Sequence, residues 1–263
     1  MKRLIRWWAP MGAALVTASL ALTLGTGVGA SAIVSAPEVG LHVLPVGSCA
    51  SINVANQSPG PAWAPTRLAA AMPVASAQKL EFYSVGTEIA LGTLETLLGP
   101  RGWSCGQLIG GDGRTGMAVY PPGSANPDGL TRVGVSPGEQ VVAAIFDYTG
   151  HLPGVYSACP YFPSVASAHG VSCPSPVPAG EKVARLTPDI VTITDPAGVK
   201  GNLAGSGGGR IVTGLMIMPQ GSGLPDSVGI AEISCSLRSA SLCSTILSDF
   251  VVRQFPIPTY PTS

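Results

Sequence analysis

Residues 210–218 read RIVTGLMIM, and residues 229–237 read GIAEISCSL. Both stretches are short and apolar, and both are bounded by polar or turn-forming residues, which favours buried β-strands. The first is too short to cross a bilayer and lies between Arg210 and Pro219. These two segments therefore predict a fold dominated by strands.

Other segments have the alternation or the β-branched and aromatic content of strands. Residues 104–109 and 115–120 flank Gly110-Gly111-Asp112-Gly113, a turn sequence that predicts a β-hairpin. Residues 140–148 fit a strand or a buried helix, and their short length favours the strand. The remaining predicted strands are residues 41–46, 78–85 and 190–194.

Two segments have helical periodicity. Residues 87–98 are predicted to form a helix, because Thr87 can cap it, its leucines share one face and Gly99-Pro100 ends it. Residues 242–250 are predicted to form a short closing helix with one apolar face. The proline-rich region over residues 153–180 holds Cys159 and Cys173, which bracket a predicted loop, and residues 198–209 are predicted to form a glycine-rich loop. The expected fold class is α+β: a strand-dominated single domain with one or two short helices, stapled by disulfides.

The amino terminus has the three parts of an export signal. Lys2, Arg3 and Arg6 precede an apolar stretch over residues 11–24, and Ala30-Ser31-Ala32 forms an A-x-A cleavage site. The sequence predicts a signal peptide over residues 1–32 and one secreted domain over residues 33–263. An uncleaved membrane anchor is disfavoured, because Gly, Thr, Ser and Ala follow Leu24. The mature protein is expected to be extracellular, without a membrane anchor.

The charge composition argues against a nucleic-acid partner. Charged residues make up 11% of the chain, whereas hydrophobic residues make up 46%, which excludes disorder. Removing the three basic residues of the signal from the 14 Lys and Arg leaves 11, against 14 Asp and Glu, so the mature charge is about −3. Because there is no basic cluster, nucleic acid is not an expected partner.

Six cysteines follow the signal, and an even number in an exported chain predicts three disulfides. Cys235 and Cys243 join a strand end to the first turn of the final helix, while Cys159 and Cys173 bracket a proline-rich loop. The third pair is then Cys49 with Cys105. A zinc site is disfavoured, because no C-x-x-C pair occurs and only His169 lies close to a cysteine.

The sequence contains no convincing catalytic or cofactor motif. A G-x-S-x-G match over residues 134–138 lacks an oxyanion donor, because Pro137 has no N–H. A second match over residues 102–106 precedes a hairpin and not a helix. The G-x-G-x-x-G match over residues 111–116 continues into a strand, whereas dinucleotide binding needs a helix there. No catalytic, cofactor-binding or metal-binding residue is therefore predicted.

Two constellations remain as candidate ligand-binding residues. Arg101 and Trp103 lie beside Cys105, where a tryptophan can pack on a disulfide or form a surface binding patch. Asp195 and Lys200 lie in a turn-rich segment, where Asp before Pro starts a turn, or where Lys200 is presented to a ligand.

The order of these motifs resembles a functionally uncharacterised family of exported bacterial proteins. The resemblance covers most of residues 78–253 and rests on Pro100-Arg101-Gly102-Trp103-Ser104-Cys105, on Asp195-Pro196-Ala197-Gly198-Val199-Lys200-Gly201, and on Cys235 and Cys243 before Asp249-Phe250. It implies export and a common fold, and it supplies no activity.

The leading functional hypothesis is a non-enzymatic secreted or cell-wall-associated binding protein. With so few charges, its recognition would depend on hydrogen bonds and aromatic contacts, which suit a neutral glycan or another exported protein. The alternative is an extracellular hydrolase whose site is assembled from scattered residues. Such a site would bring His151 or His169 together with an acid and a serine.

Overall fold

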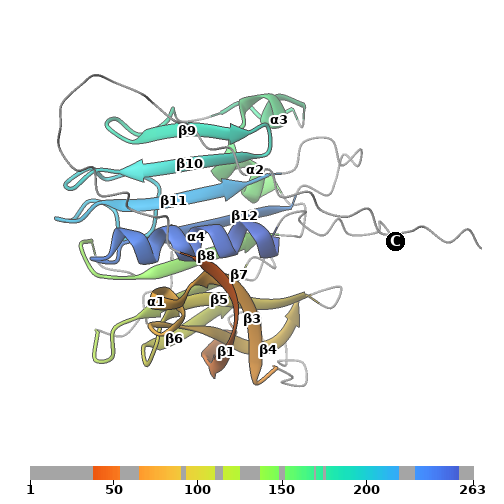
Figure 1. The fold of residues 1–263 in the computed structure, drawn as a ribbon. Coiled ribbons are helices and arrows are strands. Elements are labelled where there is room, and N and C mark those ends of the chain that lie inside the picture. Colours follow the sequence, from red (N-terminus) through yellow and green to blue (C-terminus); the bar gives the residue numbers. More distant parts are fainter. Residues whose placement is uncertain are drawn as a thin grey trace, which may run out of the picture. The chain divides into compact units, whose positions relative to one another are not determined.

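An eight-stranded sheet is the central feature of the structure (Figure 1). The computed structural model describes residues 38–53, 65–89, 93–109, 115–124, 137–147, 152–168, 170–173, 176–218 and 229–254. In spatial order the strands are β2 (Ala50–Asn53), β6 (Ser104–Ile109), β7 (Thr115–Tyr120), β8 (Val142–Asp147), β12 (Ile230–Cys235), β11 (Val212–Ile217), β10 (Ile190–Asp195) and β9 (Lys182–Thr187). All neighbours pair antiparallel except β2 and β6, which are parallel.

Side chains on both faces of β11 and β12 are buried. Helix α4 (Ala240–Gln254) covers one face, where Ile246 and Phe250 join the core. Helices α2 (Leu152–Ala158) and α3 (Pro163–Ala168) cover the other face, together with Leu203 from the segment after β10. Because both faces are covered, these strands have a nearly continuous apolar sequence and no alternation.

A second sheet has the order β3 (Arg67–Pro73), β1 (Val39–Ser48), β4 (Leu80–Ile89) and β5 (Thr93–Pro100), with the short helix α1 (Val74–Ala77) between β3 and β4. Strand β1 pairs antiparallel with β3 and, through its last residues, parallel with β4. One hydrophobic core contains side chains from both sheets and from α4, among them Phe82, Leu97, Phe146, Ile233 and Phe250. The two sheets therefore share a core.

The predicted strand-dominated α+β fold is confirmed. The predicted strands over residues 104–109 and 115–120 have the bounds of β6 and β7, and the turn between them lies outside the described residues. The other predicted strands overlap β1, β4, β8, β10, β11 and β12, and the predicted closing helix lies within α4.

The helix predicted over residues 87–98 is wrong. Within this range the described residues 87–89 belong to the end of β4 and residues 93–98 to β5, and the two strands pair antiparallel with a change of register between Ser84 and Glu88. Leu97 and Leu98 are both buried, although consecutive strand residues point to opposite faces. Because both faces of the strand are buried, its sequence lacks the apolar–polar alternation of a half-exposed strand. The spacing of its leucines then resembles one apolar face of a helix.

Several short elements were not predicted. Strand β3 is alanine-rich, which gives it little β-propensity, and all six residues of β9 are exposed. Helix α3 lies within the loop predicted between Cys159 and Cys173, and α2 directly precedes Cys159, where the sequence predicts no helix. The described residues thus contain four helices, where one or two were expected.

All three predicted disulfides are present: Cys49–Cys105, Cys159–Cys173 and Cys235–Cys243, which span 56, 14 and 8 residues of sequence. Cys49 lies where the chain leaves β1 in the smaller sheet and enters β2 in the larger one. Its bond to Cys105 therefore links the two sheets. Disulfides persist in oxidising compartments, so the three bonds indicate that the chain folds in one.

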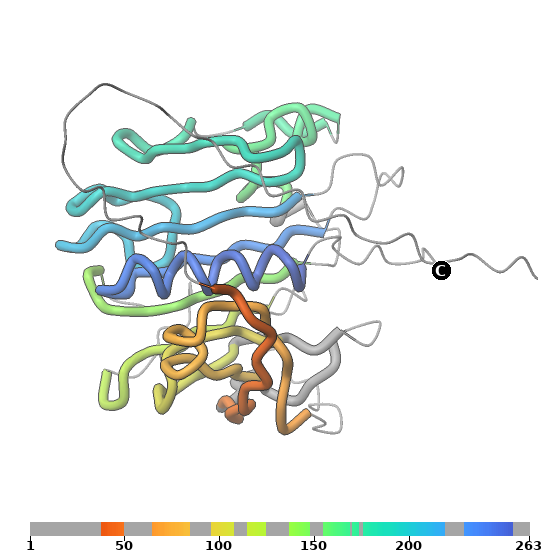
Figure 2. Tube along the Cα trace, viewed as in Figure 1, coloured from red at the N-terminus to blue at the C-terminus, as the bar shows by residue number. Residues whose placement is uncertain are grey.

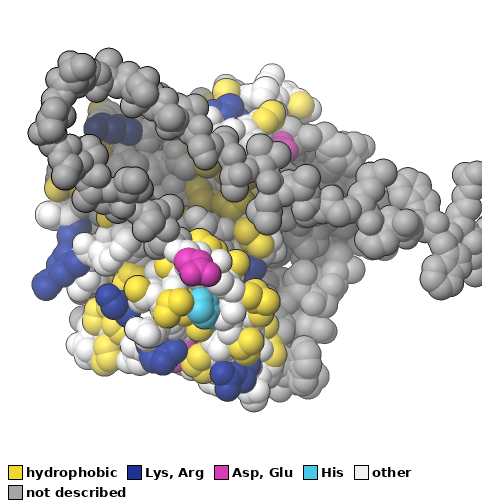
Figure 3. Space-filling model, in the orientation of Figure 1, with side chains coloured by type: hydrophobic (Ala, Val, Ile, Leu, Met, Phe, Trp, Pro, Cys, Tyr) yellow, Lys and Arg dark blue, Asp and Glu magenta, His cyan; other side chains and the backbone are white. Residues whose placement is uncertain are grey.

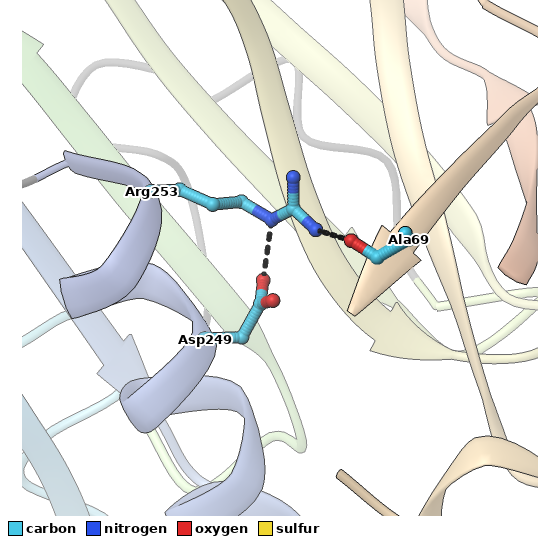
Figure 4. Close-up of polar contacts among 3 residues, drawn as sticks. All are labelled: Ala69, Asp249 and Arg253. Atoms are coloured by element: carbon cyan, nitrogen blue, oxygen red, sulfur yellow. Dashed lines mark hydrogen bonds and ion pairs between the residues drawn. The ribbon is translucent and has the colours of Figure 1, made fainter. Parts of the chain in front are cut away.

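Arg253 attaches helix α4 to the smaller sheet. Figure 2 shows α4 close to β3, although the two are far apart in sequence. The guanidinium of Arg253 donates from Nε to Asp249 at 2.8 Å and from Nη2 to the carbonyl oxygen of Ala69 in β3 (Figure 4). It also lies 4.2 Å from the ring centroid of Phe82 in β4. Burial raises the pKa of the Asp249 carboxyl, and Arg253 opposes that rise.

Replacing Arg253 with Met is expected to lower the free energy of unfolding by about 3 kcal/mol, because Asp249 is left buried without its partner. The double variant Arg253→Met/Asp249→Leu removes both charges and is expected to regain most of that loss. Urea denaturation measures both effects. The control Arg238→Met, at an exposed arginine, should stay within about 0.5 kcal/mol of the parent protein. A double variant less stable than Arg253→Met would contradict this account.

Candidate functional site

The Arg101–Trp103 corner is the turn between β5 and β6. Trp103 is partly buried and packs against the core shared by the two sheets. Its backbone N–H donates to the Tyr83 hydroxyl at 2.9 Å, and Gly102, with φ at 74°, donates to the Glu81 carboxylate at 2.8 Å. Arg101 is exposed, and its guanidinium donates to two backbone carbonyl oxygens at 3.4 Å. These contacts favour a packing role for Trp103.

Asp195 and Lys200 do not form a joint surface. Asp195 is the last residue of β10 and its exposed fraction is 0%, whereas Lys200 is exposed. Residues 196–210, named here the glycine loop, follow β10 and lead to β11. The predicted binding segment therefore presents its base to solvent and keeps its acid inside.

Asp195 belongs to a cluster of three carboxyl groups, with Glu181 and Glu232, named here the carboxyl cluster. Glu181 precedes β9, and Glu232 lies in the middle of β12. The negative charges of Glu181 and Asp195 both act on Glu232. The fold thus brings together acids from three separate segments on the face of the sheet covered by α2, α3 and the glycine loop.

Hydrogen bonds tie Glu181 and Asp195 to neighbouring residues of the glycine loop. The Asn202 N–H donates to Glu181 Oε2 at 2.9 Å, and the Leu203 N–H donates to Asp195 Oδ2 at 3.2 Å. The buried Tyr161 hydroxyl donates to Glu181 Oε1 at 2.7 Å and accepts a bond from the Asn202 amide at 2.7 Å. Two consecutive loop amides are therefore held by two different carboxyls.

The other oxygen of Asp195, Oδ1, is buried and has no hydrogen-bond donor among the described residues. The pKa of Asp195 is raised to about 7. Burial is the largest cause, followed by a hydrogen bond with Glu181 and the negative charge of Glu181. Burial and the charges of Glu181 and Asp195 likewise raise the pKa of Glu232 to about 7. If Asp195 is protonated, it can donate a hydrogen bond to Glu181, and its unbonded oxygen then gains a partner.

The glycine loop packs tightly around this carboxyl. A Cβ on Gly201 would lie 1.8 Å from Asp195 Oδ1, and one on Gly208 would lie 2.1 Å from the backbone nitrogen of Gly138. The loop also pairs with itself, through Gly198 N–H to Gly208 O at 2.7 Å and Gly207 N–H to Val199 O at 2.8 Å. The glycines therefore allow close backbone approach, and the loop is ordered.

The rejected catalytic motifs have the expected surroundings where they are described. Ser104 begins strand β6, so no helix follows the match over residues 102–106. Thr115 begins β7 at the end of the G-x-G-x-x-G match, which continues as a strand. Gly134, Ser136, His151 and His169 lie outside the described residues. Within the described part of the chain, no three His, Cys, Asp or Glu side chains are arranged to hold a metal ion.

Among the described residues, exposed apolar side chains line strand β1. Val39, Leu41 and Val43 alternate along β1, and their exposed fractions are 61%, 75% and 54%. Figure 3 shows Lys and Arg side chains scattered over the visible face, with hydrophobic atoms between them. Among the described residues, no helix is both long and apolar enough for a membrane span.

The sequence pattern points to Asp195 as a candidate site residue and does not point to Glu181, Glu232, Tyr161 or Asn202. One signal was present: Glu232 interrupts the apolar strand sequence IAEIS. A charged residue inside a buried strand requires a polar partner or a raised pKa. Glu181 and Tyr161 carry no comparable signal, because their surroundings depend on the fold.

The carboxyl cluster is expected to make the protein more stable in mild acid than in mild alkali. Asp195 and Glu232 titrate near pH 7 when folded and near pH 4 when unfolded, so the folded state binds more protons between these values and stability falls as the pH rises. Asp195→Asn should reduce this loss by at least about 1 kcal/mol, or roughly 2–4 °C in Tm. Thermal melts at about pH 5.5 and pH 8 measure it. Glu38→Gln, at an exposed carboxyl directly before β1, should leave the pH dependence unchanged, and a parent protein more stable at pH 8 would refute the expectation.

No protein-family model, curated protein or solved structure matches this chain. The resemblance to exported bacterial proteins therefore stays a prediction.

Proposed function

We propose that this chain is an exported, non-catalytic binding protein that uses the glycine loop to bind a neutral glycan or another exported protein. The observation that carries the proposal is the ordering of this loop. Its backbone is bonded to itself and to the carboxyl cluster, while Lys200 and Asn202 remain exposed. A loop held in one conformation by a rigid scaffold loses little entropy on binding.

The chemistry of the exposed loop suits an uncharged ligand. Lys200 and Asn202 offer hydrogen-bond donors, and the glycines allow a ligand to approach the backbone closely. The low charge of the surface provides little long-range attraction, so short-range hydrogen bonds would supply the specificity. The Arg101–Trp103 corner is the weaker candidate surface, because Trp103 packs against the core.

A hydrolase is the second candidate, and the carboxyl cluster is the observation that favours it. A carboxyl with a pKa near 7 can act as a general acid at neutral pH. Glu232 lies in β12 and shares this cluster with the fully buried Asp195, so it is the carboxyl that this alternative would assign as the acid. Turnover of glycoside or ester substrates that is lost in Glu232→Gln, with the fold intact, would replace the binding proposal with this one.

Lys200→Ala is expected to weaken binding by roughly fivefold, or about 1 kcal/mol, without lowering stability. An array of neutral oligosaccharides and a panel of exported proteins serve as probes, followed by calorimetry on the positives. Lys79→Ala is the matched control, because Lys79 is also exposed but lies next to the Arg101 corner. Trp103→Ala should lower stability by about 2 kcal/mol or more and leave binding unchanged. The opposite outcome, weaker binding in Trp103→Ala and none in Lys200→Ala, would move the site to the corner.

Export is part of the proposal, and the mature amino terminus is expected at Ile33. Residues 1–37 lie outside the described residues, so this expectation rests on the order of the basic, apolar and A-x-A segments. Amino-terminal sequencing of protein from the culture medium checks it. Full-length protein recovered from the membrane fraction would contradict it.

A further inference from the structure

Glu181 and Asp195 lie within hydrogen-bonding reach of each other, and the described donors are too few for their four carboxyl oxygens. The described donors supply three, from Tyr161, Asn202 and Leu203, and these occupy both oxygens of Glu181 and one oxygen of Asp195. Asp195 Oδ1 is buried without a donor, next to Gly201. Two facing carboxylates would repel each other there, whereas a single proton on Asp195 supplies the missing hydrogen bond.

No described cation neutralises the carboxyl cluster. Strand β12 contributes Glu232, and β11 contributes no charged residue. On β9, Lys182 is exposed, and Arg185 donates to the carbonyl oxygens of Pro188 and Tyr161. The glycine loop contributes the exposed Lys200, and Arg210 at its end donates to the Gly138 carbonyl oxygen. Tyr161 adds a buried hydroxyl from the segment between α2 and α3.

The same two carboxyls hold the glycine loop to the sheet. The amides of Asn202 and Leu203 are consecutive, and each is bonded to a different member of the pair. The Leu203 side chain is buried on the sheet, where it lies beside Gly214 of β11. If the two carboxyl groups move apart, the N–H groups of Asn202 and Leu203 cannot both remain hydrogen-bonded to them.

We propose that Glu181 and Asp195 share one proton, and that loss of this proton to solvent as the pH rises separates the pair and loosens the glycine loop. While Asp195 keeps the proton, the hydrogen bond between the two carboxyls holds and the loop is closed. Loss of the proton removes this hydrogen bond and adds a negative charge where no described cation neutralises it. The inference concerns the loop itself and holds whether or not the loop binds a ligand.

The pH range follows from the surroundings of the pair. Burial and the charge of Glu181 raise the pKa of Asp195 to about 7, so the loss of the proton falls between mildly acidic and mildly alkaline conditions. Glu232 titrates in the same range and adds a further negative charge as the pH rises. Both changes act in the same direction and destabilise the closed loop.

Hydrogen exchange of the full mature protein tests the inference. Protection factors, corrected for the chemical pH dependence of exchange, are compared for peptides over residues 198–207 and for the central strands β11 and β12. In the parent protein, protection of the loop should fall by about tenfold or more between pH 5.5 and pH 8.5, relative to the central strands. Loop protection that does not change with pH would overturn the proposal.

Asp195→Asn is the informative variant. The Asn oxygen can accept from the Leu203 N–H and its amide can donate to Glu181, which reproduces the protonated pair at every pH. Loop protection in this variant should stay within about threefold of its value in mild acid, while Glu38→Gln should behave as the parent. A fall in Asp195→Asn equal to that of the parent protein would overturn the proposal.

A direct titration keeps the inference testable if Asp195→Asn does not fold. The carboxyl carbons of the parent protein, labelled with carbon-13, are followed by NMR, and Glu181→Gln assists the assignment of the pair. An Asp195 signal that titrates near pH 7 supports the shared proton. A signal that titrates near pH 4 overturns it.

Discussion

Both faces of strands β11 and β12 are buried, and the surrounding elements are arranged to meet this requirement. A sheet covered on one side only would leave apolar side chains such as Met216 and Met218 in water. Helix α4 covers one face and is fixed to it by the Cys235–Cys243 disulfide. Helices α2 and α3, with Leu203 of the glycine loop, cover the other, and the Cys159–Cys173 bond joins the segments around these two helices.

The helices and the loop that cover this face also raise the pKa values of the carboxyl cluster. Asp195 and Glu232 lie on the face that α2, α3 and the glycine loop close off, so their charged forms lose hydration. No ion pair compensates within the described part of the chain, and protonation near neutral pH is the alternative. Closing the loop over the sheet and raising the pKa of Asp195 are therefore two results of one packing arrangement.

Helix α4 also joins the two sheets, through its core face and through Arg253. Phe250 packs 5.8 Å from Phe146 of β8, between ring centroids, while Arg253 reaches Ala69 of β3 and Phe82 of β4. The long disulfide closure Cys49–Cys105 links the same two sheets from the other end of the chain. The smaller sheet thus depends on the last helix, although it is built from the first strands.

Local patterns in the sequence determined the elements that have a short apolar stretch between polar or turn-forming residues, such as β11 and β12, or a clear turn sequence. The strand bounds at residues 104–109 and 115–120 could be read from the sequence, because a glycine-rich stretch typical of turns separates them. The disulfide pairs followed from spacing, since the two short closures leave only Cys49 with Cys105. Only the tertiary structure decided that residues 93–100 form a strand, because pairing with β4 and burial of both Leu97 and Leu98 outweigh their helical spacing. It alone also formed the carboxyl cluster: Tyr161, Glu181, Asp195 and Glu232 are distant in sequence, and the raised pKa of Asp195 comes from burial and from neighbouring charges that exist only when the chain is folded.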